Sequence, residues 1–171
     1  LSGSGPKGGG TAEFASNDDA GKAISALNPD QVTADLQALI AHVSKLPASN
    51  GKVVVGGFCW GGAQTFRIAT NNKDIKAGFV FYGSPPKDED IPNIVAPIYG
   101  FYGSNDARIN TTIPKTVELM KAAGKKYEPI TYDGAGHGYM KSGEDPANTN
   151  PANTKAREES WKRLKEILAK I

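Results

Sequence analysis

The sequence has one cysteine, little net charge and no long apolar run, and each shortage excludes a class of protein. A single cysteine among 171 residues excludes an internal disulfide and leaves Cys59 as a free thiol. A formal net charge of +2 argues against a nucleic-acid or membrane-surface partner. No apolar run reaches the length of a membrane span, and no metal-ligand spacing is present. We therefore expect a globular chain that needs no metal or organic cofactor.

The first 29 residues contain few apolar side chains and many Gly, Ser, Asp and Asn. Residues 2–10 resemble a flexible linker, although a natural surface loop has the same composition. We expect residues 1–29 to form a flexible glycine-rich loop or lid segment, and residues 30–171 to belong to one domain. A helix is predicted over residues 30–46 from an apolar stripe at helical spacing: Val32, Leu36, Leu39, Ile40 and Val43. His42 lies beside that stripe and is interpreted as an ordinary surface or boundary histidine.

The rest of the sequence alternates between strand-like and helix-like segments. Strands are predicted over residues 53–57, 77–83, 96–103 and 127–132. Helices are predicted over residues 62–70, 114–123 and 154–171, with Gly124 as a C-cap and polar loops over 87–93 and 144–153. The last helix carries Trp161, Leu164, Ile167 and Leu168 on one side. This order predicts an α/β fold with a mostly parallel sheet flanked by helices, and ligands at the C-terminal strand ends.

A side chain that can act as a nucleophile stands where the first strand meets its helix, in the stretch Gly57-Phe58-Cys59-Trp60-Gly61. In such a turn the glycines let strand and helix approach closely, and the sharp corner exposes the nucleophile. The backbone N–H of Trp60 then points to the space where an oxyanion would form. A helix N-terminus directly after Cys59 is expected to favour the thiolate.

Two further polar residues follow later strands. Asp106 ends the turn at residues 103–106, and His137 lies in the glycine-rich loop at residues 134–138. The chain order of nucleophile, acid and histidine is that of the α/β-hydrolases, and it differs from the order in chymotrypsin and subtilisin. The sequence therefore predicts a catalytic triad of Cys59, His137 and Asp106.

Each of these residues also has a purely structural interpretation. A lone cysteine such as Cys59 is typical of a small buried hydrophobe, Asp106 suits a turn or a helix cap, and His137 suits a loop. Three matches in the correct order favour the triad. A redox-responsive thiol is an alternative, although the sequence has no second cysteine to resolve an oxidised one.

The motifs at residues 57–62, 102–106 and 134–139 resemble those of the dienelactone hydrolase family, α/β-hydrolases with cysteine in place of the usual serine. The resemblance covers about residues 31–171 and implies hydrolysis of a small lactone or carboxylic ester, with dienelactone as the name substrate. It also implies substrate contacts from Tyr139 and from Lys141, which stands where the family has an arginine that binds the substrate carboxylate. Lysine keeps the charge but lacks the planar fork, and a solvated lysine is the alternative.

The family fold has several strands before the nucleophile strand, where this sequence has only a helix and a glycine-rich loop. The resemblance implies that the missing part brings the second oxyanion N–H and covers one edge of strand 53–57. We expect the C-terminal part of a hydrolase domain, completed by its own N-terminal segment or by a second copy. The alternative is a fragment that is not catalytic alone. No signal peptide is visible, which favours the cytoplasm, while periplasmic export stays open because the true N-terminus is expected upstream.

Overall fold

The structure is a computed structural model that describes residues 10–171. Residues 1–9, which are part of the expected glycine-rich loop, lie outside the described residues. The chain divides into two compact units, Leu1–Gly51 and Lys52–Ile171. The helix expected to open the main domain therefore belongs to the first unit, and the whole strand-helix alternation belongs to the second.

The first unit contains η1 (Thr11–Glu13), α1 (Asn17–Ser25) and α2 (Pro29–Val43). The prediction of a loop up to residue 29 is therefore wrong for α1. Ser16 caps this helix, because its hydroxyl oxygen accepts a hydrogen bond from the Asp19 backbone N–H at 3.1 Å. The apolar side chains of α1 are few and mostly small, Ala20, Ala23 and Ile24, and they stand in a stretch rich in Gly, Ser, Asp and Asn, which is why the sequence did not reveal this helix.

The second helix starts where it was predicted and ends earlier. Asn28 caps α2 by accepting hydrogen bonds from the backbone N–H groups of Asp30 and Gln31 at 2.8 and 3.2 Å. Within the predicted apolar stripe, Val32 and Ile40 are buried, whereas Leu39 is 54% exposed. The buried face of α2 is therefore narrower than the sequence pattern indicated.

The second unit confirms the α/β fold with a parallel sheet flanked by helices. Its four strands are β1 (Val54–Phe58), β2 (Ala77–Phe81), β3 (Ile98–Gly103) and β4 (Tyr127–Tyr132). They are all parallel, in the order β1-β2-β3-β4. The helices between and after them are α3 (Trp60–Asn71), η2 (Asp88–Asn93), α4 (Ala107–Asn110), α5 (Ile113–Ala122), α6 (Tyr139–Ser142) and α7 (Pro151–Leu168).

Two predicted loops are shorter than expected. The segment 87–93 forms the 3-10 helix η2 over most of its length. The loop before the last helix ends at Asn150, whose side-chain oxygen accepts from the Ala152 backbone N–H at 3.0 Å and so begins α7 three residues before the predicted start at residue 154. Gly124 follows α5 with φ of 67°, as expected of a C-cap glycine.

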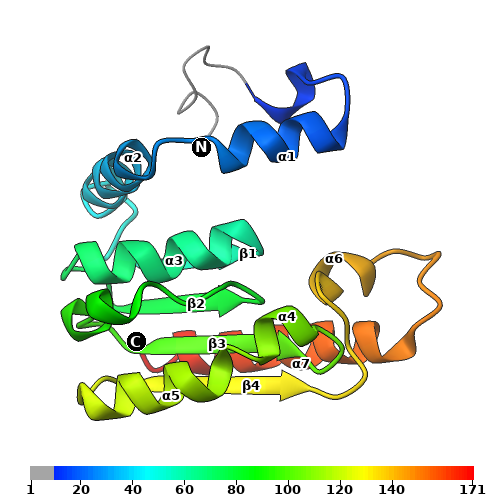
Figure 1. Cartoon of the computed structure of the whole chain (residues 1–171). Coiled ribbons are helices and arrows are strands. Elements are labelled where there is room, and N and C mark those ends of the chain that lie inside the picture. Colours follow the sequence, from blue (N-terminus) through cyan, green and yellow to red (C-terminus); the bar gives the residue numbers. More distant parts are fainter. Residues whose placement is uncertain (1–9) are drawn as a thin grey trace. The chain divides into compact units, whose positions relative to one another are not determined.

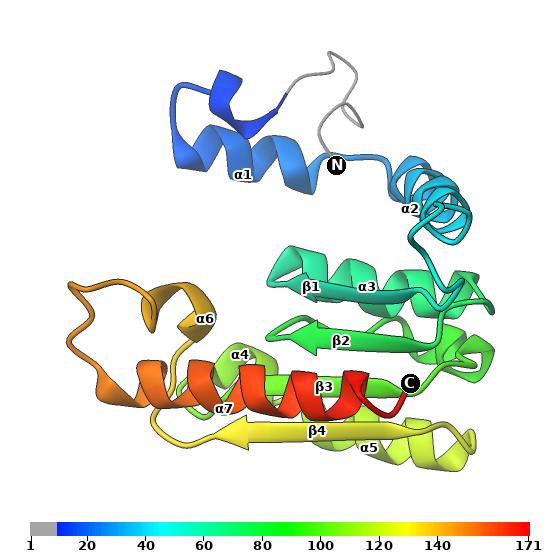
Figure 2. The same cartoon turned by 180° about the vertical axis from the view of Figure 1, so that it is seen from behind.

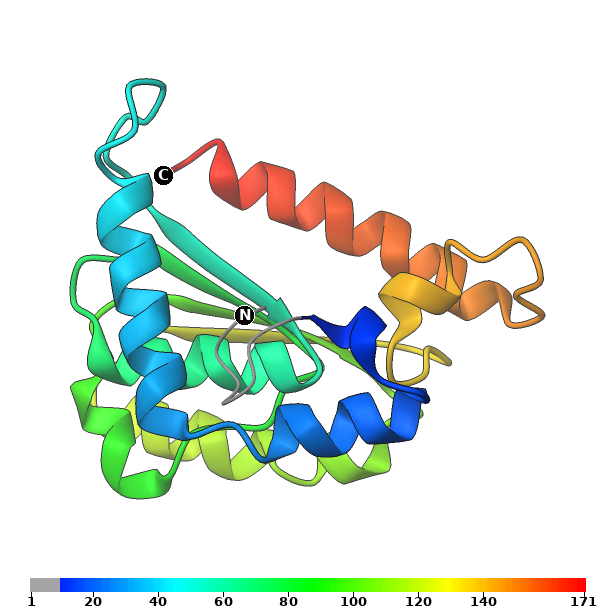
Figure 3. The ribbon, with the colours of Figure 1, turned by 90° about the horizontal axis from the view of Figure 1, so that it is seen from above.

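Helices cover both faces of this sheet. Figure 1 shows α3 and α5 in front of the strands, and Figure 2, from behind, shows α7 across the opposite face. The view from above in Figure 3 separates the same two layers. All four strands point toward the end where α6 lies against the start of α7. The three predicted catalytic residues follow strands at this end.

Aromatic side chains form the core between the sheet and α7. The rings of Phe81 and Phe101 stack with their centroids 4.4 Å apart. Arg163 of α7 lies over Phe101 at 4.5 Å and donates hydrogen bonds to the Gly100 and Glu128 carbonyl oxygens, both at 2.7 Å. These contacts hold α7 over β3 and β4.

One edge of the sheet is β4, which contains Pro129. The backbone N–H groups of Ile98 and Ser104 donate to the carbonyls of Lys126 and Tyr132, each at 2.9 Å. Even-numbered residues of this segment therefore direct their backbone polar groups toward β3. The nitrogen of Pro129 faces away from β3, where its missing N–H removes no bond from the sheet.

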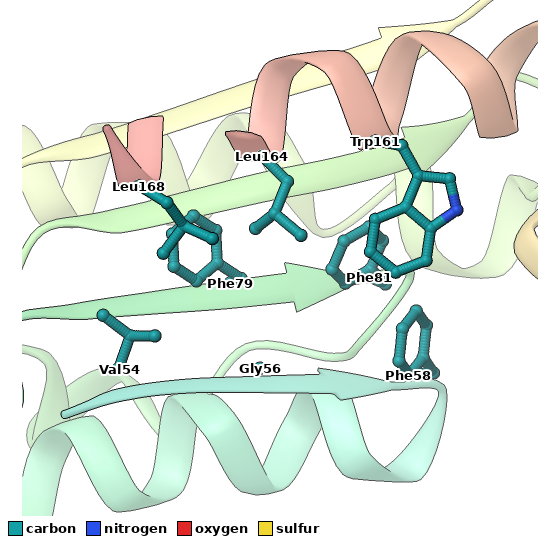
Figure 4. A pocket seen from close by; sticks show the side chains of 8 residues that line it. All are labelled: Val54, Gly56, Phe58, Phe79, Phe81, Trp161, Leu164 and Leu168. Atoms are coloured by element: carbon teal, nitrogen blue, oxygen red, sulfur yellow. The ribbon is translucent and has the colours of Figure 1, made fainter. Parts of the chain in front are cut away.

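The other edge is β1, and within residues 10–171 no strand pairs with its second side. The part of the fold expected upstream was predicted to cover one edge of this strand, and the described sheet supplies a neighbour at the other edge, β2. Beside β1 lies an apolar groove of about 190 Å³ (Figure 4). Its lining comes from β1, β2 and α7 and includes Val54, Phe58, Phe79, Trp161, Leu164 and Leu168. Trp161 and Leu168, which were predicted on the buried side of the last helix, are 37% and 41% exposed.

An apolar groove next to an unpaired strand edge favours self-association. We expect the purified 171-residue chain to associate with rising concentration in sedimentation velocity. Leu168→Lys places a charge in the groove and should shift the chain toward monomer. Val117→Lys changes an apolar residue of similar exposure, 37%, on α5 and should not. A wild-type chain that stays monomeric, or equal effects of both substitutions, would contradict this expectation.

Candidate active site

Cys59 lies at a strained corner between β1 and α3. Its φ of 52° is unusual for a residue other than glycine. A Cβ on Gly57 would come within 2.1 Å of the Gly61 carbonyl oxygen, so only glycine allows the strand and the helix to come this close. The Cys59 backbone N–H donates to the Phe81 carbonyl at 3.1 Å and ties the corner to β2. The sharp turn predicted from the sequence is therefore present.

Asp106 lies directly after β3 and is 6% exposed. Its Oδ1 accepts a hydrogen bond from the Ile109 backbone N–H at 3.4 Å and caps α4. Its Oδ2 lies 2.5 Å from Nδ1 of His137. The carboxylate therefore caps α4 and also makes the predicted contact with His137.

His137 connects the acid to the thiol. Its Nδ1 faces Asp106, and its Nε2 lies 3.1 Å from Sγ of Cys59. A proton on Nδ1 donates to the carboxylate and leaves Nε2 free to accept the thiol proton. The structure thus brings together Cys59, His137 and Asp106 within hydrogen-bond reach at the C-terminal ends of the strands.

The loop that carries His137 is held by side-chain amides and a hydroxyl. The Gly134 carbonyl accepts from Nδ2 of Asn105 at 3.0 Å and from Nδ2 of Asn150 at 2.9 Å. The Gly134 N–H donates to Oγ of Ser104 at 2.8 Å, and the Gly136 N–H donates to Oδ1 of Asn153 at 3.0 Å. The sequence analysis did not identify these supports, since polar residues in loops give no distinguishing pattern.

The pKa of the Cys59 thiol is raised above its ordinary value, mainly because the sulfur is partly buried, although the residue as a whole is exposed. The charge of Asp106 raises this pKa further, and the exposed Arg108 lowers it. The helix start after Cys59 had been expected to favour the thiolate, but burial and the nearby carboxylate act in the opposite direction. A thiol of this kind depends on a base to remove its proton, and Nε2 of His137 is placed to do so.

Trp60 is the first residue of α3, where a backbone N–H has no acceptor within the helix. The role of this N–H as an oxyanion donor stays a prediction. Lys141 is exposed on α6, four residues after His137. Neither residue makes a contact that assigns it a role.

Tyr139 had been expected to contact substrate, and the structure instead places it in the core. Its side chain is 0% exposed, and its hydroxyl lies 2.6 Å from Oγ of Ser160. Burial is the main cause that raises the pKa of Tyr139 well above its ordinary value. A side chain enclosed in this way supports the loop after His137 rather than forming a surface for a ligand.

Within residues 10–171, no three His, Cys, Asp or Glu side chains lie together in an arrangement that could hold a metal ion. None of the helices in this part of the chain is long and apolar enough to cross a bilayer.

The sequence profile of the dienelactone hydrolase family matches residues 7–171. A candidate carboxymethylenebutenolidase of Methylorubrum extorquens is 31% identical over 155 residues, which are 84% of this chain and 52% of that protein. One of Escherichia coli is 32% identical over 151 residues, which are 81% of this chain and 54% of that protein. The chain therefore spans about half the length of the curated relatives it matches. The fold is similar to that of a candidate dienelactone hydrolase of Klebsiella pneumoniae, with a TM-score of 0.76 and 24% identity, covering 90% of this chain and 67% of that one.

The charge of Arg108 should be measurable in the reactivity of the thiol. Because its positive charge lowers the pKa of Cys59, Arg108→Gln should raise that pKa. Alkylation by iodoacetamide near neutral pH should then slow by roughly twofold to fivefold, less at high salt. Lys115→Gln removes the same charge from an exposed residue of α5 that pairs with Asp88, and it serves as the control. If the rate of alkylation depends on pH in the same way in the wild type and in Arg108→Gln, the expectation would be contradicted.

Proposed function

Because the chain belongs to the dienelactone hydrolase family, we propose that it hydrolyses small lactones or carboxylic esters with Cys59 as the nucleophile. The observation that carries this proposal is the position of His137 between two partners. Its Nε2 lies 3.1 Å from the Cys59 Sγ, and its Nδ1 lies 2.5 Å from the Asp106 carboxylate. This is the arrangement in which a base activates a nucleophile and an acid orients the base.

The first half of the proposed reaction forms a thioester. His137 removes the proton of Cys59 as the sulfur attacks the carbonyl carbon, and Asp106 stabilises the imidazolium that results. The Trp60 N–H donates to the developing oxyanion. When the tetrahedral intermediate collapses, the bond to the leaving oxygen breaks, and His137 returns the proton to that oxygen. In a lactone the released alcohol stays attached to the acyl group.

The second half releases the acid. His137 removes a proton from water, and the resulting hydroxide attacks the thioester carbonyl. The carbon–sulfur bond breaks, and the thiol recovers its proton from the imidazolium. The raised pKa of Cys59 favours proton removal during attack over a thiolate–imidazolium pair at rest. The lack of a second cysteine in the sequence argues against a redox-responsive thiol.

A second candidate is that the 171 residues are not catalytic alone and become active only with a further N-terminal segment or a second copy. Two observations favour it. The chain covers 52% and 54% of two curated relatives, and β1 has no strand on its second side within the described residues. The elbow supplies one oxyanion donor, Trp60, and loss of one donor costs about 3 kcal/mol of transition-state stabilisation.

Turnover of p-nitrophenyl acetate with and without iodoacetamide separates these candidates. Because Cys59 is the single cysteine, the reagent modifies a known position. If the chain alone is fully active and iodoacetamide abolishes that activity, the result would support the hydrolase. If activity appears only after the N-terminal part of a relative is added, the result would support the second candidate. Activity that survives alkylation would exclude Cys59 as the nucleophile.

Substitution of the nucleophile gives a second test. Cys59→Ala should lower kcat by at least about a thousandfold, because no thioester can form. Cys59→Ser should leave a weak esterase, since a hydroxyl has a much higher pKa than a thiol and depends more on His137. Circular dichroism of both variants checks that the fold is kept. Unchanged turnover by a folded Cys59→Ala variant would rule out the proposed mechanism.

Lys141 is proposed to select substrates that carry a carboxylate, because it is exposed and follows His137 by four residues. Lys141→Met should raise KM for a carboxylate-bearing lactone by roughly fivefold and leave KM for a neutral ester unchanged. Lys121→Met, which changes an exposed lysine on α5, is the control. Equal changes for the anionic and the neutral substrate would show that Lys141 has no recognition role.

A further inference from the structure

Tyr82, directly after β2, has a backbone conformation that tyrosine rarely adopts. Its φ is 40°, and among the described residues Cys59 is the other non-glycine residue with positive φ. The left-handed region is unfavourable for a bulky side chain and persists where the surrounding structure imposes it. Tyr82 is also 3% exposed, so its ring is enclosed by neighbours.

Three backbone contacts around Tyr82 impose this conformation. The Tyr82 N–H donates to the Phe101 carbonyl at 2.8 Å, and the Phe81 carbonyl before it accepts from the Cys59 N–H at 3.1 Å. A Cβ on Gly83 would lie 2.4 Å from the Gly62 carbonyl carbon, so the chain after Tyr82 packs directly on the start of α3. The turn that strains Tyr82 is therefore fixed to the same elbow that carries Cys59.

The strained backbone directs the Tyr82 ring at the loop after β4. The ring meets the His137 imidazole at a centroid distance of 5.0 Å and an interplanar angle of 61°. It meets the Tyr139 ring at 5.4 Å and 71°. Burial and the neighbouring Cys59 raise the pKa of the Tyr82 hydroxyl, while a hydrogen bond from the Met140 backbone N–H lowers it. The side chain thus contacts His137 and two of the three residues that follow it.

His137 makes two hydrogen bonds, to Asp106 and to Cys59, and the Tyr82 ring adds a third contact to the imidazole. The residue lies between Gly136 and Gly138, and its side chain is 36% exposed. The hydrogen bond from Nδ1 to Asp106 fixes one atom but leaves rotation about that bond open. A rotation of that kind moves Nε2 away from the Cys59 sulfur.

We infer that Tyr82 is a positioning residue, whose ring holds the His137 imidazole in the orientation that points Nε2 at the Cys59 sulfur. The edge of an aromatic ring against an imidazole is a directional contact, so it fixes the plane of the imidazole as well as its place. The kinetic consequence of this role rests on the proposed hydrolase function, but the orientation itself does not.

Nuclear magnetic resonance of the full chain tests the orientation directly. The sequence contains two histidines, so His42, in the other unit, is an internal reference. In the wild type we expect an NOE between the Tyr82 and His137 rings, and nitrogen shifts of a single His137 tautomer protonated at Nδ1. Tyr82→Leu should average the His137 tautomers and leave the His42 signals unchanged. Tyr82→Phe should keep the single tautomer because it keeps the ring.

Tyr132→Leu is the matched control. Tyr132 is 7% exposed and meets the Tyr139 ring at 5.6 Å, so its loss disturbs the same aromatic cluster from the other side. Tyr132→Leu should leave the single His137 tautomer unchanged. If Tyr82→Leu does not fold, the wild-type NOE and the Tyr82→Phe spectrum decide the question. Absence of the NOE, or a His137 signal that Tyr82→Leu and Tyr132→Leu change equally, would overturn the inference.

Kinetics adds an independent measurement. Tyr82→Leu should lower kcat for p-nitrophenyl acetate by roughly tenfold to a hundredfold and change KM less than about twofold, because the substitution misplaces a base rather than a binding group. A wild type without esterase activity would contradict the proposed function and leave the resonance test of Tyr82 standing. An active wild type whose kcat and His137 tautomer both survive Tyr82→Leu would overturn the role of Tyr82 alone.

Discussion

The close approach of backbone to backbone between the end of β2 and the start of α3 is the constraint on which the site depends. No side chain fits at Gly57 or Gly83, so β1, β2 and α3 meet through main-chain atoms. This contact leaves Cys59 and Tyr82 with positive φ, one presenting a thiol and the other a ring. Strain at two neighbouring corners is thus imposed by packing that the rest of the sheet stabilises.

Parallel topology then brings three loops to one end of the sheet. Asp106 joins two of them, since one carboxylate oxygen caps α4 and the other meets His137. A single side chain therefore links the local stability of the corner after β3 to the orientation of an imidazole contributed by the loop after β4. Loosening of α4 would release the imidazole as well as the helix start.

The parts that were predictable from the sequence depend on local pattern. Apolar runs predicted the four strands, and glycines near Cys59, Asp106 and His137 indicated the turns at the strand ends. Tyr82 was not recognised because its φ and its contact with His137 arise from packing between distant segments. Tyr139 was assigned to the substrate because it lies in the histidine motif, yet its hydroxyl bonds to Ser160 of α7, a pairing that sequence spacing does not contain. The effect of the helix start on the thiol was the only influence visible in the sequence, whereas partial burial and the charge of Asp106 depend on the tertiary structure.

The two edges of the described sheet differ in what they accept. At β4, Pro129 turns a nitrogen without a hydrogen outward, and such an edge rejects a further strand in regular pairing. At β1 the outer side carries no such block within the described residues. A further strand would lose a hydrogen bond at Pro129 of β4 and none for this reason at β1. Extension of the described sheet is therefore more favourable at β1 than at β4.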